Sequence, residues 1–107
     1  MQTYITLMTF TEEGARHLAK TTARAEAFRK VAEQRGIKIV NTFWTAGVFD
    51  VVHIFEVESE EDAMAHSYSL SSLGNVRTQT FRAYNQEEIE PIVKKVFNPY
   101  DLLKAGD

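Results

Sequence analysis

The sequence contains no cysteine, and this absence excludes several kinds of chemistry. Without thiols the chain forms no disulfide, offers no thiolate to a metal ion and has no cysteine nucleophile. It also lacks a glycine-rich phosphate loop, a His-Glu-x-x-His pair and a Gly-x-Ser-x-Gly motif. Most nucleotide-binding and metal-hydrolase functions are therefore excluded, and we expect no metal site.

Excess positive charge and long apolar runs are missing as well. The chain has 12 Lys and Arg against 15 Asp and Glu, a net charge of −3, whereas sequence-independent nucleic-acid binding needs a basic surface. No segment approaches the roughly 18 apolar residues of a membrane span, and the first residues have no basic leader. We therefore expect no nucleic-acid partner, no membrane partner and no signal peptide. A cytoplasmic location fits these absences and the lack of cysteine.

What is present is the apolar periodicity of one packed domain. The pattern predicts strands over residues 3–10, 37–45, 48–57 and 76–84. It predicts helical structure over residues 11–36, with a break near Thr21 and Thr22, and over residues 59–74. A terminal helix is indicated by apolar residues at helical spacing: Ile89, Ile92, Val93, Val96 and Phe97.

The order strand-helix-strand-strand-helix-strand is typical of a ferredoxin-like α+β sandwich. Its antiparallel sheet has the strand order 4-1-3-2, and both helices cover one face. Pro91 would break the terminal helix unless the helix begins there, as proline at a first helical position allows, and we expect the helix to end at Asn98-Pro99. Residues 1–98 then form a single domain, and residues 99–107 form a C-terminal tail.

The middle hairpin sorts side chains into two faces. If Ala46 and Gly47 form a two-residue turn, directly opposed residues share a face. One face of the sheet is aliphatic: Ile5, Leu7, Ile37, Ile39, Phe43, Val52, Ile54 and Phe81, together with Asp50. The other is mostly aromatic and polar: Tyr4, Thr6, Met8, Trp44, Phe49, Val51, His53, Phe55, Thr80 and Arg82. We assign the aliphatic set to the helix-covered core.

The aromatic face would then be open, because only the tail helix remains to cover it. Monomers rarely expose so large an apolar patch, so we expect a homodimer or higher homo-oligomer through this face. Alternatively, the open face holds a ligand pocket beside the partner, or the partner fills it completely.

Four stretches are similar to the GYD-domain family: YITL, RAEAF, WTAGVFDVV and SLGNVRTQTFRAY. The resemblance covers about residues 3–90. The family's Gly-x-Tyr-Asp motif stands here as Gly47-Val48-Phe49-Asp50, so the tyrosine hydroxyl is absent. The resemblance implies a dimeric α/β barrel and a homodimer, but it implies no general activity. The wider group includes cofactor-independent monooxygenases, haem-degrading enzymes, isomerases and ligand-sensing domains, so the fold alone is a weak guide to chemistry.

His53 is the main candidate for catalysis, as an acid or base near neutral pH or as a haem or metal ligand; a packed histidine with one hydrogen bond is the alternative. Asp50 and His53 point to opposite faces and form no dyad. We interpret Gly47 and Asp50 as structural turn residues, although Asp50 could also act as a general base. For His17 and His66 we expect surface or boundary positions, although the inner stripe of the helix over residues 59–74 contains either His66 or Ser67, together with Ala63, Leu70 and Leu73.

We therefore expect a small organic ligand on the open face, bound by Tyr4, Thr6, Trp44, Phe49, His53, Thr80 and Arg82. Tyr4 and Trp44 could stack on a flat ligand, and Arg82 could bind an anion or form an ion pair. Under this hypothesis the protein binds its ligand without catalysis and without a cofactor. The alternative is a cofactor-independent monooxygenase or a haem-handling enzyme that uses the same residues.

Overall fold

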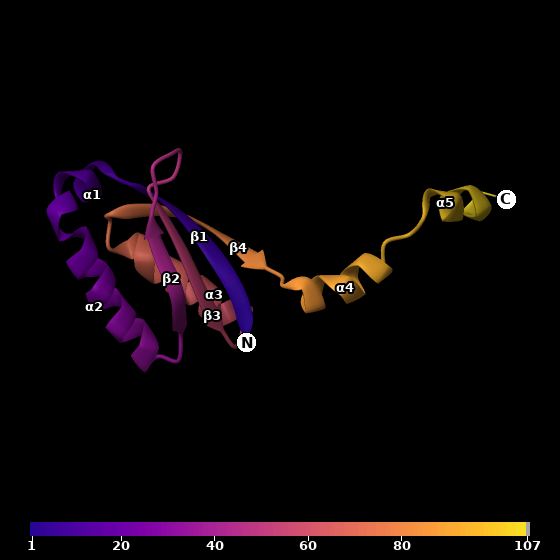
Figure 1. The fold of residues 1–107 in the computed structure, drawn as a ribbon, viewed down its shortest axis with the longest axis horizontal. Helices are drawn as coiled ribbons and strands as arrows, with labels where there is room; N and C mark the ends of the chain where they lie inside the picture. Colours follow the sequence, from indigo (N-terminus) through magenta and orange to yellow (C-terminus); the bar gives the residue numbers. More distant parts are fainter. Residues whose placement is uncertain (107) are drawn as a thin grey trace.

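The computed structural model describes residues 1–106, which form one body and a projecting arm (Figure 1). The strands are β1 (Gln2–Phe10), β2 (Lys38–Trp44), β3 (Val51–Val57) and β4 (Val76–Ala83). The helices are α1 (Glu12–Arg16), the 3₁₀ turn η1 (Leu18–Lys20), α2 (Thr21–Gln34), α3 (Glu60–Ser72), α4 (Gln86–Lys94) and α5 (Pro99–Ala105). None of these helices has the length and apolarity that crossing a bilayer requires.

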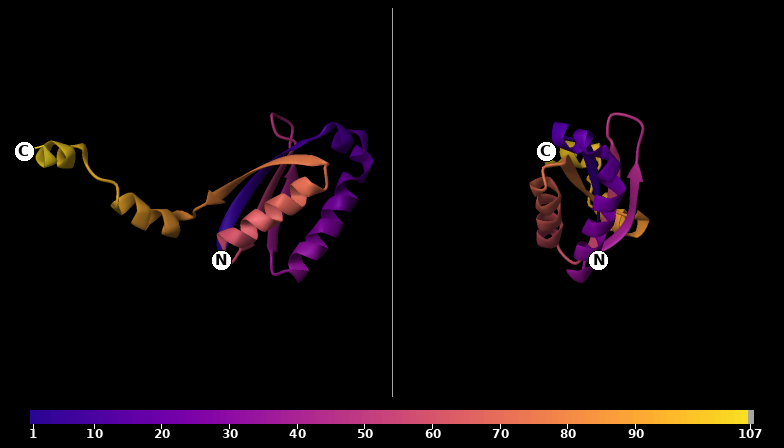
Figure 2. Two further views of the ribbon diagram at one scale, coloured as in Figure 1. Left: turned by 180° about the vertical axis from the view of Figure 1, so that it is seen from behind. Right: turned by 90° about the vertical axis from the view of Figure 1, so that its left-hand side faces the viewer.

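The four strands form one antiparallel sheet in the order β2-β3-β1-β4. Both α2 and α3 lie on the same face of this sheet, as the view from behind shows (Figure 2). The predicted α+β fold and strand order are therefore confirmed. The expected helix break near Thr21 is also present, because α1 and η1 precede α2.

Local chemistry explains the limits of α3. The Ser59 side chain accepts a hydrogen bond from the backbone N–H of Asp62, which caps the first turn. Gly74, which follows the helix, has φ +80°, a conformation that glycine adopts without steric cost. Between these ends, α3 buries Ala63, His66 and Leu70 against the sheet.

The prediction of which face the helices cover is wrong. Apart from Ile37 and Ile39, the alternation grouped the strand residues correctly, but the aromatic and polar set lies beneath α2 and α3. The face that remains open is aliphatic. The covered side chains include Tyr4, Thr6, Met8, Val51, His53 and Phe55, each less than a tenth exposed. On the open face, Ile5, Leu7, Val52 and Ile54 are half-buried, and Phe43 and Phe81 are each 50% exposed.

A bulge in β2 changes the faces of two residues. The register with β3 shifts between Ile39 and Asn41, so Ile39 pairs with Phe55 on the covered face. Ile37 is also buried there, in the cluster that contains Tyr4 and Phe55. The expectation that Ile37 and Ile39 share a face with Phe43 is therefore wrong.

The β2–β3 connection is longer than the expected two-residue turn. It spans residues 45–50 and is closed by a 2.8 Å hydrogen bond from Thr45 N–H to the Asp50 carbonyl. Gly47 does not have the positive φ expected of it. Asp50 ties the loop to β1: its Oδ2 accepts from Phe10 N–H, and its own N–H donates to the Met8 carbonyl, both at 2.8 Å.

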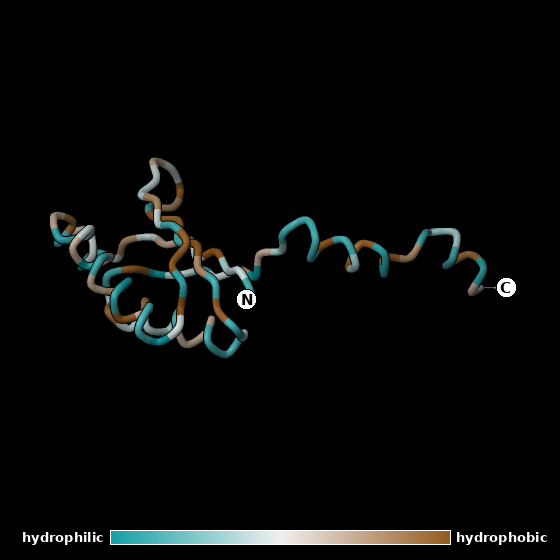
Figure 3. The backbone as a smooth tube through the Cα atoms, turned by 60° about the horizontal axis from the view of Figure 1, so that its bottom comes forward, coloured by the Kyte–Doolittle hydropathy of each residue, from teal (hydrophilic) through white to brown (hydrophobic). Residues whose placement is uncertain are grey.

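Helices α4 and α5 form an arm that leads away from the sheet and makes the molecule 64 Å long, although it is only 30 Å by 21 Å across (Figure 1). The prediction that Pro91 either breaks the terminal helix or begins it is wrong, and so is its expected end at Asn98-Pro99, because α4 ends at Lys94 and Pro99 begins α5. Asn85 and Glu88 form a reciprocal capping box, so α4 begins at Gln86 and contains Pro91 within it. Apolar and polar stretches alternate along the arm (Figure 3).

Candidate ligand site: a cavity between helix α2 and the sheet

A cavity of about 370 Å³ lies between α2 and the covered face of the sheet. Its walls are mainly apolar and include Met8, Phe28, Ile39, Val51, Leu70 and Val76. Three polar side chains of the sheet, Asn41, Thr42 and His53, also line it. The volume and the mixture of apolar walls with a few polar groups are typical of small-molecule sites.

His53 and His66 form a hydrogen-bonded pair beneath this cavity. Their Nε2 atoms are 2.9 Å apart, and Thr42 Oγ1 lies 2.9 Å from His53 Nδ1. His53 is 4% exposed and His66 is 2% exposed, and the His66 ring packs on Phe28 and Phe55. The pair therefore joins β2, β3 and α3 through one chain of polar contacts.

Burial keeps both imidazoles neutral. Desolvation lowers the pKa of His53 to about 4. It also lowers the pKa of His66 to about 3, and the neighbouring His53 adds to that shift. A hydrogen bond between two neutral imidazoles needs one donor and one acceptor. One ring therefore carries a proton at Nε2, and the other ring accepts that hydrogen bond with an unprotonated Nε2. The Thr42 hydroxyl can donate or accept, so the hydrogen bonds that run from Thr42 through His53 to His66 can all point in either direction.

The mouth of the cavity is polar and is bridged on one side. Trp44 Nε1 donates to Thr21 Oγ1 at 3.1 Å, which links the end of β2 to the start of α2. Arg24, whose Nη1 donates to the His17 carbonyl at 3.1 Å, also lines the cavity. Arg29 is paired with Glu26 and Glu33, so its charge is already compensated.

A second, more open groove of about 770 Å³ runs between α3 and the edge strand β4. Hydroxyl groups connect its two sides: Thr80 Oγ1 lies 2.8 Å from Thr6 Oγ1 and 2.7 Å from Ser67 Oγ. Arg82, at one end, forms a 2.7 Å ion pair with Glu88. The hydrogen bond from Arg82 also lowers the pKa of the Glu88 carboxyl. Arg82 is thus occupied by a structural ion pair.

The seven side chains expected to bind one ligand do not form a single site on an open face. Trp44 and His53 line the cavity. Tyr4, Thr80 and Arg82 line the groove along β4. Thr6 is fully buried between strands, and Phe49 lies half-buried in the β2–β3 loop. Whether these residues bind a ligand stays a prediction, but the placement of Tyr4, Thr6, His53 and Thr80 on an open face is wrong.

His66 is the site residue that sequence reasoning placed incorrectly. We expected a surface or boundary position, whereas it is buried in contact with His53. A signal was present, because His66 lies on the inner stripe of α3 with Ala63 and Leu70. A histidine on such a stripe needs a polar partner on the facing sheet, and the face that carries Thr6, His53 and Thr80 provides one. Within residues 1–106 no group of three or more His, Asp or Glu side chains is arranged to hold a metal ion.

The fold and the cavity define a ferredoxin-like α+β protein with a candidate binding site on its helix-covered side. The chain belongs to the GYD domain family, whose model matches residues 4–93. It is 31% identical over 84 residues to the "Glutamine synthetase and cystathionine beta-lyase binding protein" of Thermus thermophilus. That match covers 78% of this chain and 88% of the relative.

A crystal structure of TTHA0845, also from Thermus thermophilus, has the same fold. The TM-score is 0.58 at 20% sequence identity, and the match covers 79% of this chain and 95% of that one. The similarity therefore extends over the body of the molecule, and at this identity it concerns the fold alone.

Proposed function

We propose that this GYD-domain protein binds a small, partly aromatic organic molecule in the cavity beneath α2 and works as a homo-oligomer formed through its open sheet face. The observation that carries the proposal is the 370 Å³ cavity, with apolar walls above a neutral histidine pair. A flat apolar body would pack against Phe28 and Val51, and a polar group would meet Thr42 and His53. The ligand site is therefore proposed for the covered face, and the assembly for the opposite face.

A binding role is favoured over catalysis by the contacts of His53. Both of its ring nitrogens already have protein partners, Thr42 and His66, each at 2.9 Å. A haem ligand, or a general base acting directly on a bound molecule, would need one of these nitrogens to be released first. The monooxygenase or haem-handling alternative therefore requires a rearrangement, whereas ligand binding in the cavity does not.

A role in binding other proteins is the second candidate. The Thermus relative is named as a protein that binds glutamine synthetase and cystathionine beta-lyase. By analogy, this chain would bind protein partners, and a ligand in the cavity would then regulate those contacts. This candidate rests on the relative's name, and the cavity is the feature that can be tested directly.

Filling the cavity tests the ligand proposal. Ala25 lines the cavity, whereas Ala27, on the same helix, is exposed and does not line it. Native mass spectrometry of freshly purified protein should show a bound small molecule in the unchanged chain and in Ala27→Phe. The bound molecule should be absent from Ala25→Phe, because a phenyl ring would occupy its place.

A titration with 4-hydroxybenzoate, a flat aromatic acid, gives a second measurement. Trp44 is the chain's one tryptophan and lies at the cavity, so its emission reports binding directly. We expect Ala25→Phe to weaken binding at least about tenfold, which corresponds to about 1.4 kcal/mol. Equal binding by the two phenylalanine variants in both experiments would contradict a ligand in this cavity.

A further inference from the structure

The α4–α5 arm carries apolar side chains that its own chain does not bury. Five of them lie on α4 or just after it and are between 39% and 72% exposed: Ile89, Ile92, Val93, Val96 and Phe97. Leu102 and Leu103 of α5 are 62% and 68% exposed. An isolated helix shorter than about 12 residues is marginal in water, and packing of an apolar face normally stabilises it. Helices of nine and seven residues therefore need a surface to pack against.

The start of the arm is held in a direction that leads away from its own sheet. Only Tyr84 and Asn85 separate β4 from α4. The Glu88 side chain accepts from Asn85 N–H at 3.1 Å and from Arg82 at 2.7 Å, and the Arg82 guanidinium lies 4.4 Å from the Tyr84 ring centroid. The Arg82–Glu88 bond therefore ties the start of α4 to the end of β4, and Figures 1 and 2 show the arm projecting outward from the sheet.

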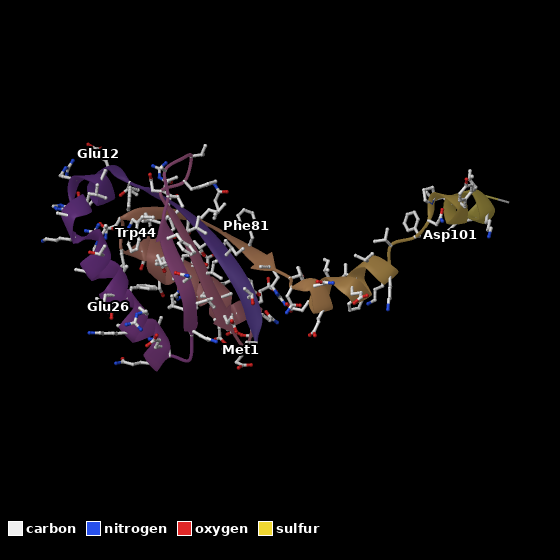
Figure 4. The ribbon with its side chains drawn as sticks, in the orientation of Figure 1. Met1, Glu12, Glu26, Trp44, Phe81 and Asp101 are labelled. Carbon is white, nitrogen blue, oxygen red and sulfur yellow. The ribbon has the colours of Figure 1, made fainter. Side chains whose placement is uncertain are left out.

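The open sheet face is the matching surface. Its centre is aliphatic, and its two most exposed apolar side chains, Phe43 and Phe81, lie on the two edge strands. Phe81 is seen projecting from β4 in Figure 4. Four strands at about 4.8 Å spacing give a face about 19 Å wide. Two helices, each about 10 Å across, cover such a width, as α2 and α3 do on the other face. The arm also carries two helices.

We propose that the α4–α5 arm of each copy packs against the open sheet face of a second copy of this chain. The proposal rests on the open-face assembly stated under the proposed function and says which element covers that face. The arm's apolar side chains and those of the sheet are then buried together. Without the arm, a face about 19 Å by about 23 Å has a planar area of only about 440 Å², short of the roughly 800 Å² that each partner buries in a stable complex.

Cross-linking between two singly substituted chains tests this contact, and the absence of native cysteine makes the result specific. Val93→Cys places a thiol on the arm, and Phe43→Cys or Phe81→Cys places one on the open face. Ala27→Cys, exposed on α2, is the matched control. The Val93→Cys chain is mixed with each of the other three at micromolar concentration and oxidised, and species of about twice 12.2 kDa are measured.

We expect at least about tenfold more mixed disulfide with the open-face thiols than with Ala27→Cys, because contact within a complex raises the effective concentration to about the millimolar range. A yield equal to that of the control would overturn the proposal. So would an intramolecular cross-link in a dilute Val93→Cys Phe81→Cys chain that remains monomeric, since the arm would then cover its own sheet.

Light scattering of the unchanged chain separates this proposal from the proposed function. A monomer would overturn both the open-face assembly and the arm contact. A dimer without arm-to-face cross-links would overturn the arm contact alone. Ligand binding in the cavity, measured through Trp44, is independent of either result.

Discussion

At the scale of single residues, His53 and His66 are the most unusual feature of the molecule. Two imidazoles are buried together in a largely apolar core, and each satisfies part of the other's hydrogen-bonding capacity. Burial without a counter-charge favours the neutral form of both. The arrangement gives the cavity a polar floor without placing a charge in it.

This pair predicts a loss of stability in acid. The pKa values of about 4 and about 3 in the folded chain lie below the ordinary value of 6.5, so the unfolded chain binds protons that the folded chain does not. Above pH 6.5 the two histidines are neutral in the folded and the unfolded chain, so the pair does not lower the free energy of unfolding. Below pH 6.5 the free energy of unfolding falls toward pH 4, by up to about 1.4 kcal/mol per pH unit for each histidine. Urea unfolding between pH 6.5 and pH 4.5, followed by Trp44 emission, measures this slope.

His66→Phe keeps a ring of similar size and removes one titrating group, so we expect the slope to fall by about one proton. The matched control is His17→Gln, which removes a histidine that contacts neither His53 nor His66. An equal fall in slope in both variants would contradict the assignment of acid sensitivity to the buried pair.

At the scale of elements, α1 approaches the α3–β4 connection closely at Gly14. Gly14 is buried, and a Cβ at this position would collide with the backbone carbonyl of Asn75. Alanine in place of glycine usually stabilises a helix by about 1 kcal/mol, but here we expect Gly14→Ala to destabilise the protein by about 1–3 kcal/mol.

Urea unfolding at pH 7 measures this change. The control is Gly47→Ala, since a Cβ at Gly47 meets nothing within 4 Å and its φ is not positive. We expect the control to change the free energy of unfolding by less than about 0.5 kcal/mol. A neutral Gly14→Ala would show that the α1 contact can separate without cost.

The elements also show what the sequence can predict. Alternation assigns Tyr4, Thr6 and His53 to one face and Ile5 and Leu7 to the other, because successive strand residues point in opposite directions. It cannot say which face the helices cover when both faces are apolar. The polar inner stripe of α3 decides that question, since its His66 and Ser67 hydrogen-bond to His53 and Thr80. The bulge before Asn41 and the long β2–β3 loop depend on backbone contacts that no residue pattern specifies.

At the scale of the whole molecule, a covered core on one side contrasts with two unpartnered apolar surfaces, the open sheet face and the arm. The cavity and the histidine pair lie on the covered side, so they are complete within one chain. The open face and the arm, in contrast, have no partner within the same chain. Assembly should therefore be separable from ligand binding, and changes in the arm should affect only the former.

Charging the arm tests that separation. The exposed apolar side chains on and just after α4 form an apolar stripe: Ile89, Ile92, Val93, Val96 and Phe97. Ile92→Asp with Val96→Asp places two carboxylates on this stripe. If the stripe is buried in the complex, losing two such contacts costs roughly 3–6 kcal/mol of association, or more than about a hundredfold in the dissociation constant.

The control, Lys94→Gln with Lys95→Gln, changes the net charge by the same amount at polar positions of the arm. Light scattering over a dilution series should show monomers for the first variant and the unchanged assembly for the second, while the response of Trp44 to 4-hydroxybenzoate remains the same in both. Equal association by the two variants would mean that the stripe faces solvent in the complex, and the open face would then have to be covered by the partner's sheet alone.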